Sequence, residues 1–317
     1  MSEGMKIPLL AMSAPPYWHC GRTIRNQSML IIISLIPAIC MAIYTWGWGA
    51  MRVMGLCVGI SVFTQALCQK CMGREITIDN LTAVVTGILL SFLMPASSPW
   101  WIVALGAVIA IGLGKMAFGG LGANPLNTAL VGWAILFVSF PMYMDANVMQ
   151  LGVDYIDILN KIKYFSSAEV QRTDLSILFA GQQIGGLGSS QVGALFIGGI
   201  YLCLRGVIRW QVPMGFFLAV FIIGAIFNSF NSISDAPAFY HLFSGSIVLA
   251  GFYLATEMGT TPSRPIPLFI FGILCGVLTM LIRKYGAYTD GAPFAVLLCN
   301  LLTPYLDMIR PKPFGVR

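Results

Sequence analysis

The turn Gly185-Gly186-Leu187-Gly188-Ser189-Ser190 ends the longest polar loop of the chain and begins an apolar segment. Five apolar segments precede it and five follow it, so it lies near the centre of the chain. Glycines allow a close approach of backbone to a ligand, and Ser189 and Ser190 supply hydroxyls at a helix start. A phosphate group there would meet free backbone N–H groups and the positive end of a helix dipole. The turn is therefore a candidate cofactor site, although a serine-capped helix start explains the same residues.

The composition indicates an integral membrane protein. Hydrophobic residues make up 57% of the chain and the mean hydropathy is +0.82. Charged residues make up 9%, against about 25% in a soluble domain. The net charge of +6 comes from basic residues spread along short loops, as membrane topology requires, so it does not indicate nucleic-acid binding. The eight cysteines are expected to behave as small hydrophobic residues rather than as a disulfide framework.

Apolar runs of about 15 to 20 residues predict transmembrane helices. Ten such runs cover residues 27–46, 50–69, 81–95, 100–114, 126–142, 191–209, 212–229, 241–257, 266–283 and 292–309. The third and eighth are short and interrupted, and broken spans at matching positions in two halves are typical of internal repeats that meet at a shared site. Because each half has an odd number of spans, we predict an all-α fold of two inverted five-helix repeats.

The predicted organisation has five parts. They are an N-terminal arm (1–26), a first repeat (27–142), a loop (143–190), a second repeat (191–309) and a tail (310–317). The predicted face that holds the N-terminus carries 12 of the 18 Lys and Arg residues. The positive-inside rule therefore predicts that both termini are cytoplasmic and that the loop lies outside.

A second glycine turn precedes the fifth span, on the predicted cytoplasmic side. It reads Gly119-Gly120-Leu121-Gly122 and is followed by Asn124 and Asn127. Two such turns on opposite faces suit a two-sided transfer device. Close helix packing explains both turns equally well.

Ionisable residues near span ends are candidates for ion or proton handling, because a charged group within an apolar bundle is costly. Glu257 interrupts the eighth span and is our first candidate, and Asp79, before the third span, is the second. Lys115 follows the fourth span. A carboxylate that caps a broken helix or pairs with Arg264 explains Glu257 as well.

No metal site is predicted. Cys68 and Cys71 are three residues apart and resemble half of a redox or metal site. One pair cannot complete a four-ligand zinc or iron–sulfur site, and a chance spacing is the simpler explanation.

Several segments, in the right order over nearly the whole chain, resemble one family. It contains the D subunit of the Rnf electron-transfer complex and the B subunit of the sodium-pumping NADH:quinone reductase. The similar segments are Ile78–Gly87, Gly119–Asn127, Gly185–Trp210 and Ala255–Pro262. Two positions depart from the family pattern, with Thr128 in place of proline and Glu257 in place of aspartate. The chain length favours the Rnf-type subunit.

The resemblance implies a ten-span, urea-transporter-like subunit in a prokaryotic inner membrane. Such a subunit carries flavin in a complex that transfers electrons between ferredoxin and NAD and moves Na⁺ or H⁺. Iron–sulfur centres and the nucleotide site would lie on partner subunits. Non-covalent riboflavin would lie near Asn124 and Asn127, because amides can donate to and accept from an isoalloxazine edge, although both residues could simply cap the fifth helix.

Covalent FMN, which the family esterifies to a threonine of the outer loop, is not expected. The nearest match to the acceptor motif is Ser166-Ser167-Ala168-Glu169, which places Glu169 at the acceptor position. A glutamate cannot form that phosphoester. Thr173 is the only threonine in the loop, and it lacks the flanking residues.

The alternative function is a urea-transporter-like channel or transporter that carries a small solute and no redox cofactor. The predicted inverted repeats and the two broken spans are compatible with it. Bound flavin would separate the two hypotheses.

Overall fold

The computed structural model describes residues 23–145, 156–164, 170, 173–230 and 236–309. These residues form helices and one isolated β-bridge, between Ile156 and Gln183, and no β-strand. Glu169, the residue expected at the flavin acceptor position, lies outside the described residues. The all-α prediction is confirmed for the described chain.

The first half of the chain contains five apolar helices and two short helical turns. They are α1 (Ile24–Trp46), α2 (Trp48–Cys71), η1 (Ile78–Asn80), α3 (Thr82–Leu93), α4 (Trp100–Ile111), η2 (Gly112–Met116) and α5 (Thr128–Ser139). Their starts follow from local capping chemistry. Thr23 caps α1 by accepting from the N–H of Asn26, and Asn127 caps α5 by accepting from the N–H of Leu130, as short polar side chains commonly do.

The predicted outer loop contains short helices of its own. They are α8 (Ile158–Tyr164) and α10 (Leu175–Phe179), and α6 (Pro141–Met144) crosses the boundary between the predicted fifth span and this loop. Ile158 and Leu178 form a small hydrophobic cluster with Tyr240 of the second half. The Tyr240 hydroxyl donates to the carbonyl of Thr173. This segment therefore packs onto the second half.

The second half begins at Val192. Its elements are α11 (Val192–Leu204), α12 (Gln211–Phe230), α13 (Ala238–Phe243), α14 (Ile247–Leu249), η3 (Ala250–Leu254), α15 (Pro265–Tyr285) and α16 (Ala292–Asp307). The predicted eighth span is thus divided among α13, α14 and η3, and α3 ends at Leu93, so both spans are short, as expected.

Four helices, α1, α2, α12 and α15, are long and apolar enough to cross a membrane. Shorter apolar helices are α3, α4 with η2, α5, α11 and α16. Large apolar side chains such as Leu204 and Phe230 are more than 80% exposed, which suits a lipid environment. The chain is therefore a multi-pass membrane protein, while ten spans in inverted repeats stay a prediction.

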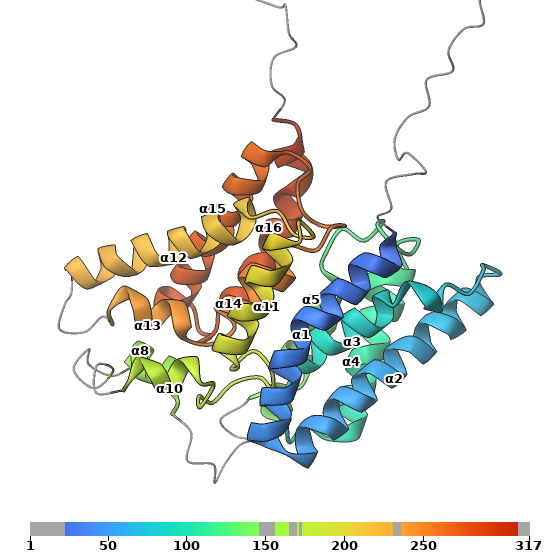
Figure 1. Cartoon of the computed structure of the whole chain (residues 1–317), viewed down its shortest axis with the longest axis horizontal. Helices are drawn as coiled ribbons and strands as arrows, with labels where there is room; N and C mark the ends of the chain where they lie inside the picture. Colours follow the sequence, from blue (N-terminus) through green and yellow to red (C-terminus); the bar gives the residue numbers. More distant parts are fainter. Residues whose placement is uncertain (1–22, 146–155, 165–169, 171–172, 231–235, 310–317) are drawn as a thin grey trace, which may run out of the picture.

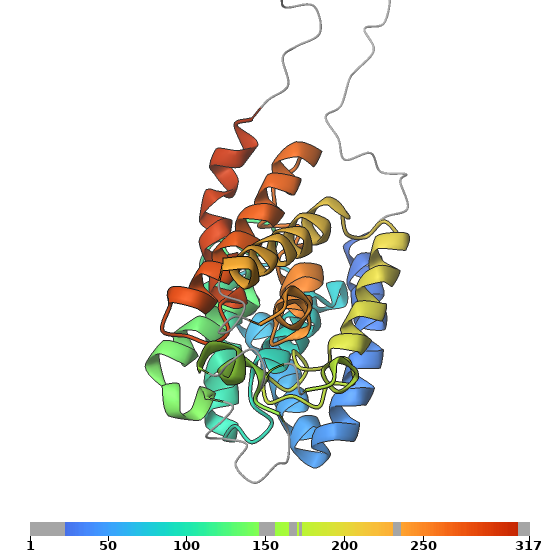
Figure 2. The ribbon, with the colours of Figure 1, turned by 90° about the vertical axis from the view of Figure 1, so that its left-hand side faces the viewer.

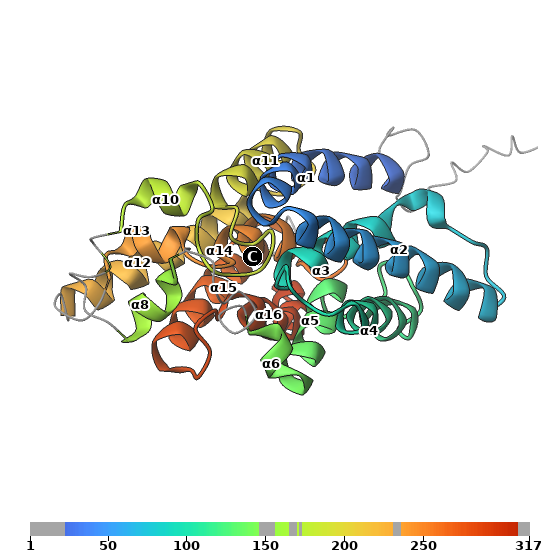
Figure 3. The ribbon, with the colours of Figure 1, turned by 90° about the horizontal axis from the view of Figure 1, so that it is seen from below.

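The two halves lie side by side, with blue to green helices on one side of Figure 1 and yellow to red helices on the other. α1 packs against α11, and α5 packs against α16, as the view from below shows (Figure 3). The quarter-turn view in Figure 2 also shows α11 running beside α1. The polar groups that bridge the halves define the candidate site.

The turn Gly185–Ser190, which we call the outer turn, packs against the end of α3 in this structure. Its N–H groups at Leu187, Gly188 and Ser189 donate to the carbonyls of Met94 and Phe92 at the end of α3. A Cβ at Gly188 would lie 2.2 Å from the Phe92 ring. The expected phosphate cradle finds no support, because these donors already have partners.

Candidate functional site

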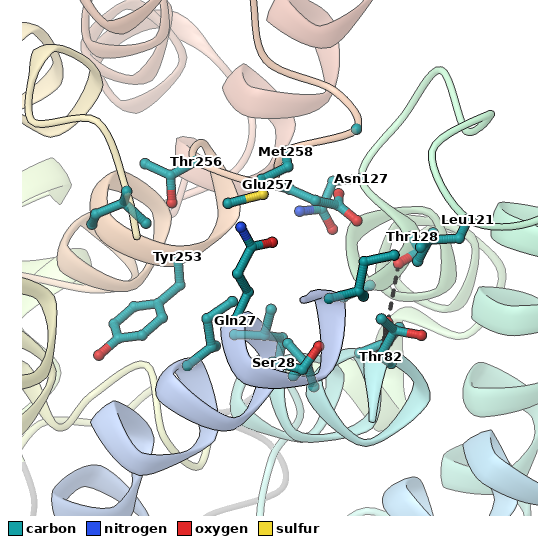
Figure 4. A pocket seen from close by; sticks show the side chains of 18 of the residues that line it. Gln27, Ser28, Thr82, Leu121, Asn127, Thr128, Tyr253, Thr256, Glu257 and Met258 are labelled. Atoms are coloured by element: carbon teal, nitrogen blue, oxygen red, sulfur yellow. Dashed lines mark hydrogen bonds between the residues drawn. The ribbon is translucent and has the colours of Figure 1, made fainter. Parts of the chain in front are cut away.

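A cavity of about 370 Å³ lies between the two halves (Figure 4). The first half contributes α1, α3, η2, α5 and the turn before α5, and the second half contributes α11, the connection from α11 to α12, η3 and the segment that follows η3. Gln27 on α1 points toward Glu257 across the cavity (Figure 4). Most of the wall is apolar, with a small set of convergent polar side chains, as in typical small-molecule sites.

Two π-helical turns lie in the cavity wall. In η2 the N–H of Ala117 donates to the carbonyl of Gly112, and in η3 the N–H of Ala255 donates to the carbonyl of Ala250. Each bond spans five residues, and such turns are frequent at functional sites. The first carries Lys115 and the second carries Tyr253, so both turns present cavity-lining residues.

Asn127 joins the halves as well as capping α5. Its Oδ1 accepts from the N–H of Leu130 at 3.1 Å, and its Nδ2 donates to the carbonyl of Leu254 at 3.0 Å. The side chain is buried. The helix-capping explanation therefore holds for Asn127, and any contact with a ligand would use the second N–H of its amide.

Asn124 and Glu257 meet at one end of the cavity. The Asn124 amide donates to the carbonyl of Leu126 at 3.1 Å, and Asn124 and the Thr128 backbone interact with the Glu257 carboxyl group. Oε2 of Glu257 is buried and has no hydrogen-bond partner among the described residues. A buried carboxylate oxygen without a partner is costly, so it marks a position where a donor or cation would bind.

The expected alternative for Glu257, an ion pair with Arg264, is not found. Arg264 donates to the carbonyl of Ile309, and the single ion pair in the described ranges joins Arg283 and Asp290. Glu257 does hold a turn, because its carbonyl accepts from the hydroxyl of Thr261. Its carboxyl group interacts with the Thr128 backbone at the first residue of α5, so the capping alternative for this carboxylate stays open, and Glu257 also lines the cavity.

Lys115 provides a buried positive charge in the same wall. Its side chain is 4% exposed, and its ammonium group donates to Oε1 of Gln65 and to Oγ1 of Thr82, both at 2.7 Å. Glu257 acts on it electrostatically through space. The sequence places Lys115 among the ionisable residues at span ends but does not show its partners, because Gln65 and Thr82 are distant in the chain.

The structure brings together four of the predicted residues and separates the rest. Gly122, Asn124, Asn127 and Glu257 all line the cavity, whereas Gly120 does not. Gly188 and Ser189 donate to α3 and Ser190 donates to Gly186 within the same turn, and these three residues lie outside the cavity lining. Asp79 is exposed in η1 and is not part of the wall.

The glycines of the second turn, Gly119–Gly122, which we call the inner turn, adopt backbone conformations that favour glycine. Gly119, Gly120 and Gly122 have φ values of +112°, +105° and +81°, a region that side chains other than glycine rarely adopt. The outer turn does not share this conformation, since positive φ values are absent from Gly185, Gly186 and Gly188.

Comparison with known proteins identifies the family. The family model for NQR2, RnfD and RnfE matches residues 11–315. The chain belongs to this family. The D subunit of the Na⁺-translocating ferredoxin:NAD⁺ oxidoreductase complex of Acetobacterium woodii is 33% identical over 97% of this chain and 96% of its own length.

Two further relatives carry the same kind of name. The D subunit of the ion-translocating oxidoreductase complex of Yersinia enterocolitica is 30% identical, over 96% of this chain and 98% of its own length. The corresponding Klebsiella pneumoniae protein is also 30% identical, over 96% and 99%. The resemblance inferred from separate motifs is thus confirmed along almost the whole chain.

Proposed function

We propose that this chain is a flavin-binding membrane subunit of a redox-driven ion translocase. The relatives are subunits of ion-translocating oxidoreductase complexes, one of them named for ferredoxin and NAD⁺. Their similarity covers both halves of the chain, including the segments around the cavity. The partners of this chain are then the other membrane and peripheral subunits of such a complex, which carry the iron–sulfur and nucleotide sites.

The observation that supports flavin binding is the cavity between the halves. Its volume of about 370 Å³ lies within the range of roughly 300–1,000 Å³ for small-molecule sites. Apolar walls from α1 and α3 suit a planar ring, while the amides of Asn124 and Asn127 suit its polar edge. Bound non-covalently, riboflavin would supply one- and two-electron transfer at this position.

Within this function, Glu257 is the ion-pathway residue. Its buried Oε2 lacks a partner in the described structure, so a proton or Na⁺ bound there would remove an unfavourable orphan charge. Asp79 is a weaker candidate, because it is exposed and lies outside the cavity wall. The choice between Na⁺ and H⁺ is a matter for the transport assay.

The finer topology belongs to the same proposal. Ten spans in two inverted, urea-transporter-like repeats would place both termini in the cytoplasm of a prokaryotic cell and the cavity on the cytoplasmic side of its inner membrane. The excess of basic residues on the predicted inner face supports this orientation. Reactivity of single cysteines with an impermeant reagent, tested at Lys70 and at Lys161, would measure it, with only position 161 labelled from outside.

Flavin content tests the function directly. The full-length chain is purified in detergent without denaturation, and its flavin is quantified by absorbance and identified by mass. The protein is then denatured and separated on a gel that is inspected for fluorescence. Flavin that is present and fully extractable supports the proposal. A chain without extractable or covalent flavin would instead support a solute channel.

A further inference from the structure

Lys115 is a buried cation whose direct contacts are all neutral. The ammonium group touches the amide oxygen of Gln65 on α2 and the hydroxyl of Thr82 at the start of α3, both at 2.7 Å. In the described structure no carboxylate lies within the 4.0 Å that defines an ion pair with it. Removing an ammonium group from water without a paired anion is costly. The cost of burying the Lys115 ammonium group must therefore be offset by another interaction or by a function.

The two neutral contacts hold the ammonium group in place and leave part of it for the cavity. An ammonium group has three N–H donors, and Gln65 and Thr82 accept two of them. Gln65 is itself oriented, because its Nε2 donates to the carbonyl of Thr77 at 3.4 Å. That backbone segment is fixed in turn by Gln69, whose Nε2 donates to the Thr77 hydroxyl at 2.7 Å. Since Lys115 lines the cavity, its third donor and its charge are available to a ligand there.

The cavity has an electrostatic direction. Lys115 from η2 contributes the positive charge, and Glu257 from the other half contributes the negative charge. The two charges attract through space but do not form a contact ion pair in the described ranges. A neutral polar ligand would thus lie between opposite charges, and negative charge on it would be favoured near Lys115.

From this geometry we infer that Lys115 is the ligand-contacting residue that stabilises negative charge on the flavin, and so sets how strongly the site favours the reduced form. The inference rests on the proposed function. Two electrons from a redox centre of a neighbouring subunit and one proton from water, added to a neutral ring, leave one negative charge. The Lys115 ammonium, preorganised by Gln65 and Thr82, stabilises that charge without rearrangement.

The experiment measures the midpoint potential of the flavin bound to the full-length chain, by electrode titration followed by absorbance. Lys115→Gln removes the charge, and Gln65→Glu keeps the lysine but neutralises it with a nearly isosteric carboxylate. For both, the ratio of affinities for reduced over oxidised flavin should fall by roughly 10- to 1,000-fold, because a unit charge has been cancelled at close range. The midpoint potential then becomes more negative.

Two further variants test the direction of the potential shift and its dependence on where the charge lies. Glu257→Gln removes a negative charge from the opposite wall, so it should shift the potential in the positive direction. Lys70→Met removes an exposed lysine from the last turn of α2 and should leave the potential unchanged. If Lys115→Gln fails to fold, Gln65→Glu alone decides the question.

The possible failures are distinguishable. A wild-type chain that holds no flavin overturns the proposed function. If the wild type binds flavin but Gln65→Glu has the same midpoint potential, the role of Lys115 is overturned and the proposed function stands. The same conclusion follows if Lys115→Gln and Glu257→Gln shift the potential in the same direction.

Discussion

Lys115 and Arg283, the two buried cations among the described residues, have opposite surroundings. Arg283 donates to the carbonyl of His241 at 2.9 Å and to that of Ser244 at 2.8 Å, and it pairs with Asp290 at 3.4 Å. Lys115 has two neutral acceptors, no contact carboxylate in the described structure, and a cavity beside it. The donors of Arg283 are largely occupied by protein acceptors, whereas the ammonium group of Lys115 remains available to a ligand.

This difference separates structural charges from functional ones. Arg283 fastens the segment between α13 and α14 to α15, and Asp290 extends the network by accepting from the N–H of Ser246. A set of contacts in which most donors find acceptors rigidifies a buried site. A charge left without a counterion is tolerated where function requires it. Substitutions in the network around Arg283 should therefore change stability, and substitutions in the cavity wall should change ligand binding or transport.

The largest effect is expected at Arg283. Arg283→Met removes the ion-pair partner of Asp290 and leaves the carbonyls of His241 and Ser244 without this donor, at a cost of about 1–3 kcal/mol for each buried group left unsatisfied. We expect a loss of unfolding free energy of that size, measured by denaturant titration of the detergent-solubilised chain. Arg205→Met, at an exposed helix end, is the matched control. An equal loss in both variants would remove the structural role of Arg283.

The second-largest effect is expected at Glu257, which we compare with the second acidic residue, Asp290. Glu257→Gln keeps the size of the side chain and removes the charge, so ion-dependent turnover of the assembled complex should fall at least about tenfold if the carboxylate binds the ion. Stability should change little. The measurement is the ion gradient formed by proteoliposomes during electron transfer.

The matched variant is Asp290→Asn, which should reduce stability by weakening the ion pair with Arg283. Transport per folded complex should be retained in it. An unchanged gradient in Glu257→Gln would show that the unpaired oxygen is not an ion site.

The third effect separates capping from ligand binding at Asn127. Asn127→Ala removes the cap of α5 and the bond to Leu254, for a loss of about 0.5–2 kcal/mol. Asn127→Asp keeps a capping oxygen but removes the amide donors. If the amide binds the ligand, Asn127→Asp should lose extractable riboflavin while the chain remains assembled.

A joint replacement completes the test of the amides. Asn124→Ala with Asn127→Ala should lower extractable riboflavin more than either single change. Flavin content equal to that of the wild type in the double variant would exclude both amides from the site.

Sequence patterns predicted the parts of the molecule that depend on nearby residues. The short third and eighth spans follow from proline and glycine punctuation, and the cap at Asn127 follows from residue type. These features need only a few consecutive residues to be recognised.

Features that depend on distant contacts were not predictable in the same way. The outer turn has glycines because α3 approaches it, and the Phe92 ring would collide with a Cβ at Gly188. The sequence contains no signal for that contact, so the same glycines also suggest a phosphate cradle. The surroundings of Lys115 were likewise not predictable, because Gln65, which accepts from its ammonium group, lies fifty positions away.

The smallest expected effect is an absence of flavin from the outer side. We expect no adduct on any peptide of residues 143–190, because Glu169 occupies the expected acceptor position and the two candidate hydroxyls, those of Thr173 and Ser190, are enclosed. Thr173 and Ser190 are 4% and 1% exposed, and attachment of a phosphoester needs an accessible hydroxyl. Peptide mass mapping of the purified chain measures this, with the extractable flavin of the same sample as the positive reference. A flavin mass on Thr173 or Ser190 would show that these two hydroxyls become accessible in the cell and that the expected absence of covalent flavin is wrong.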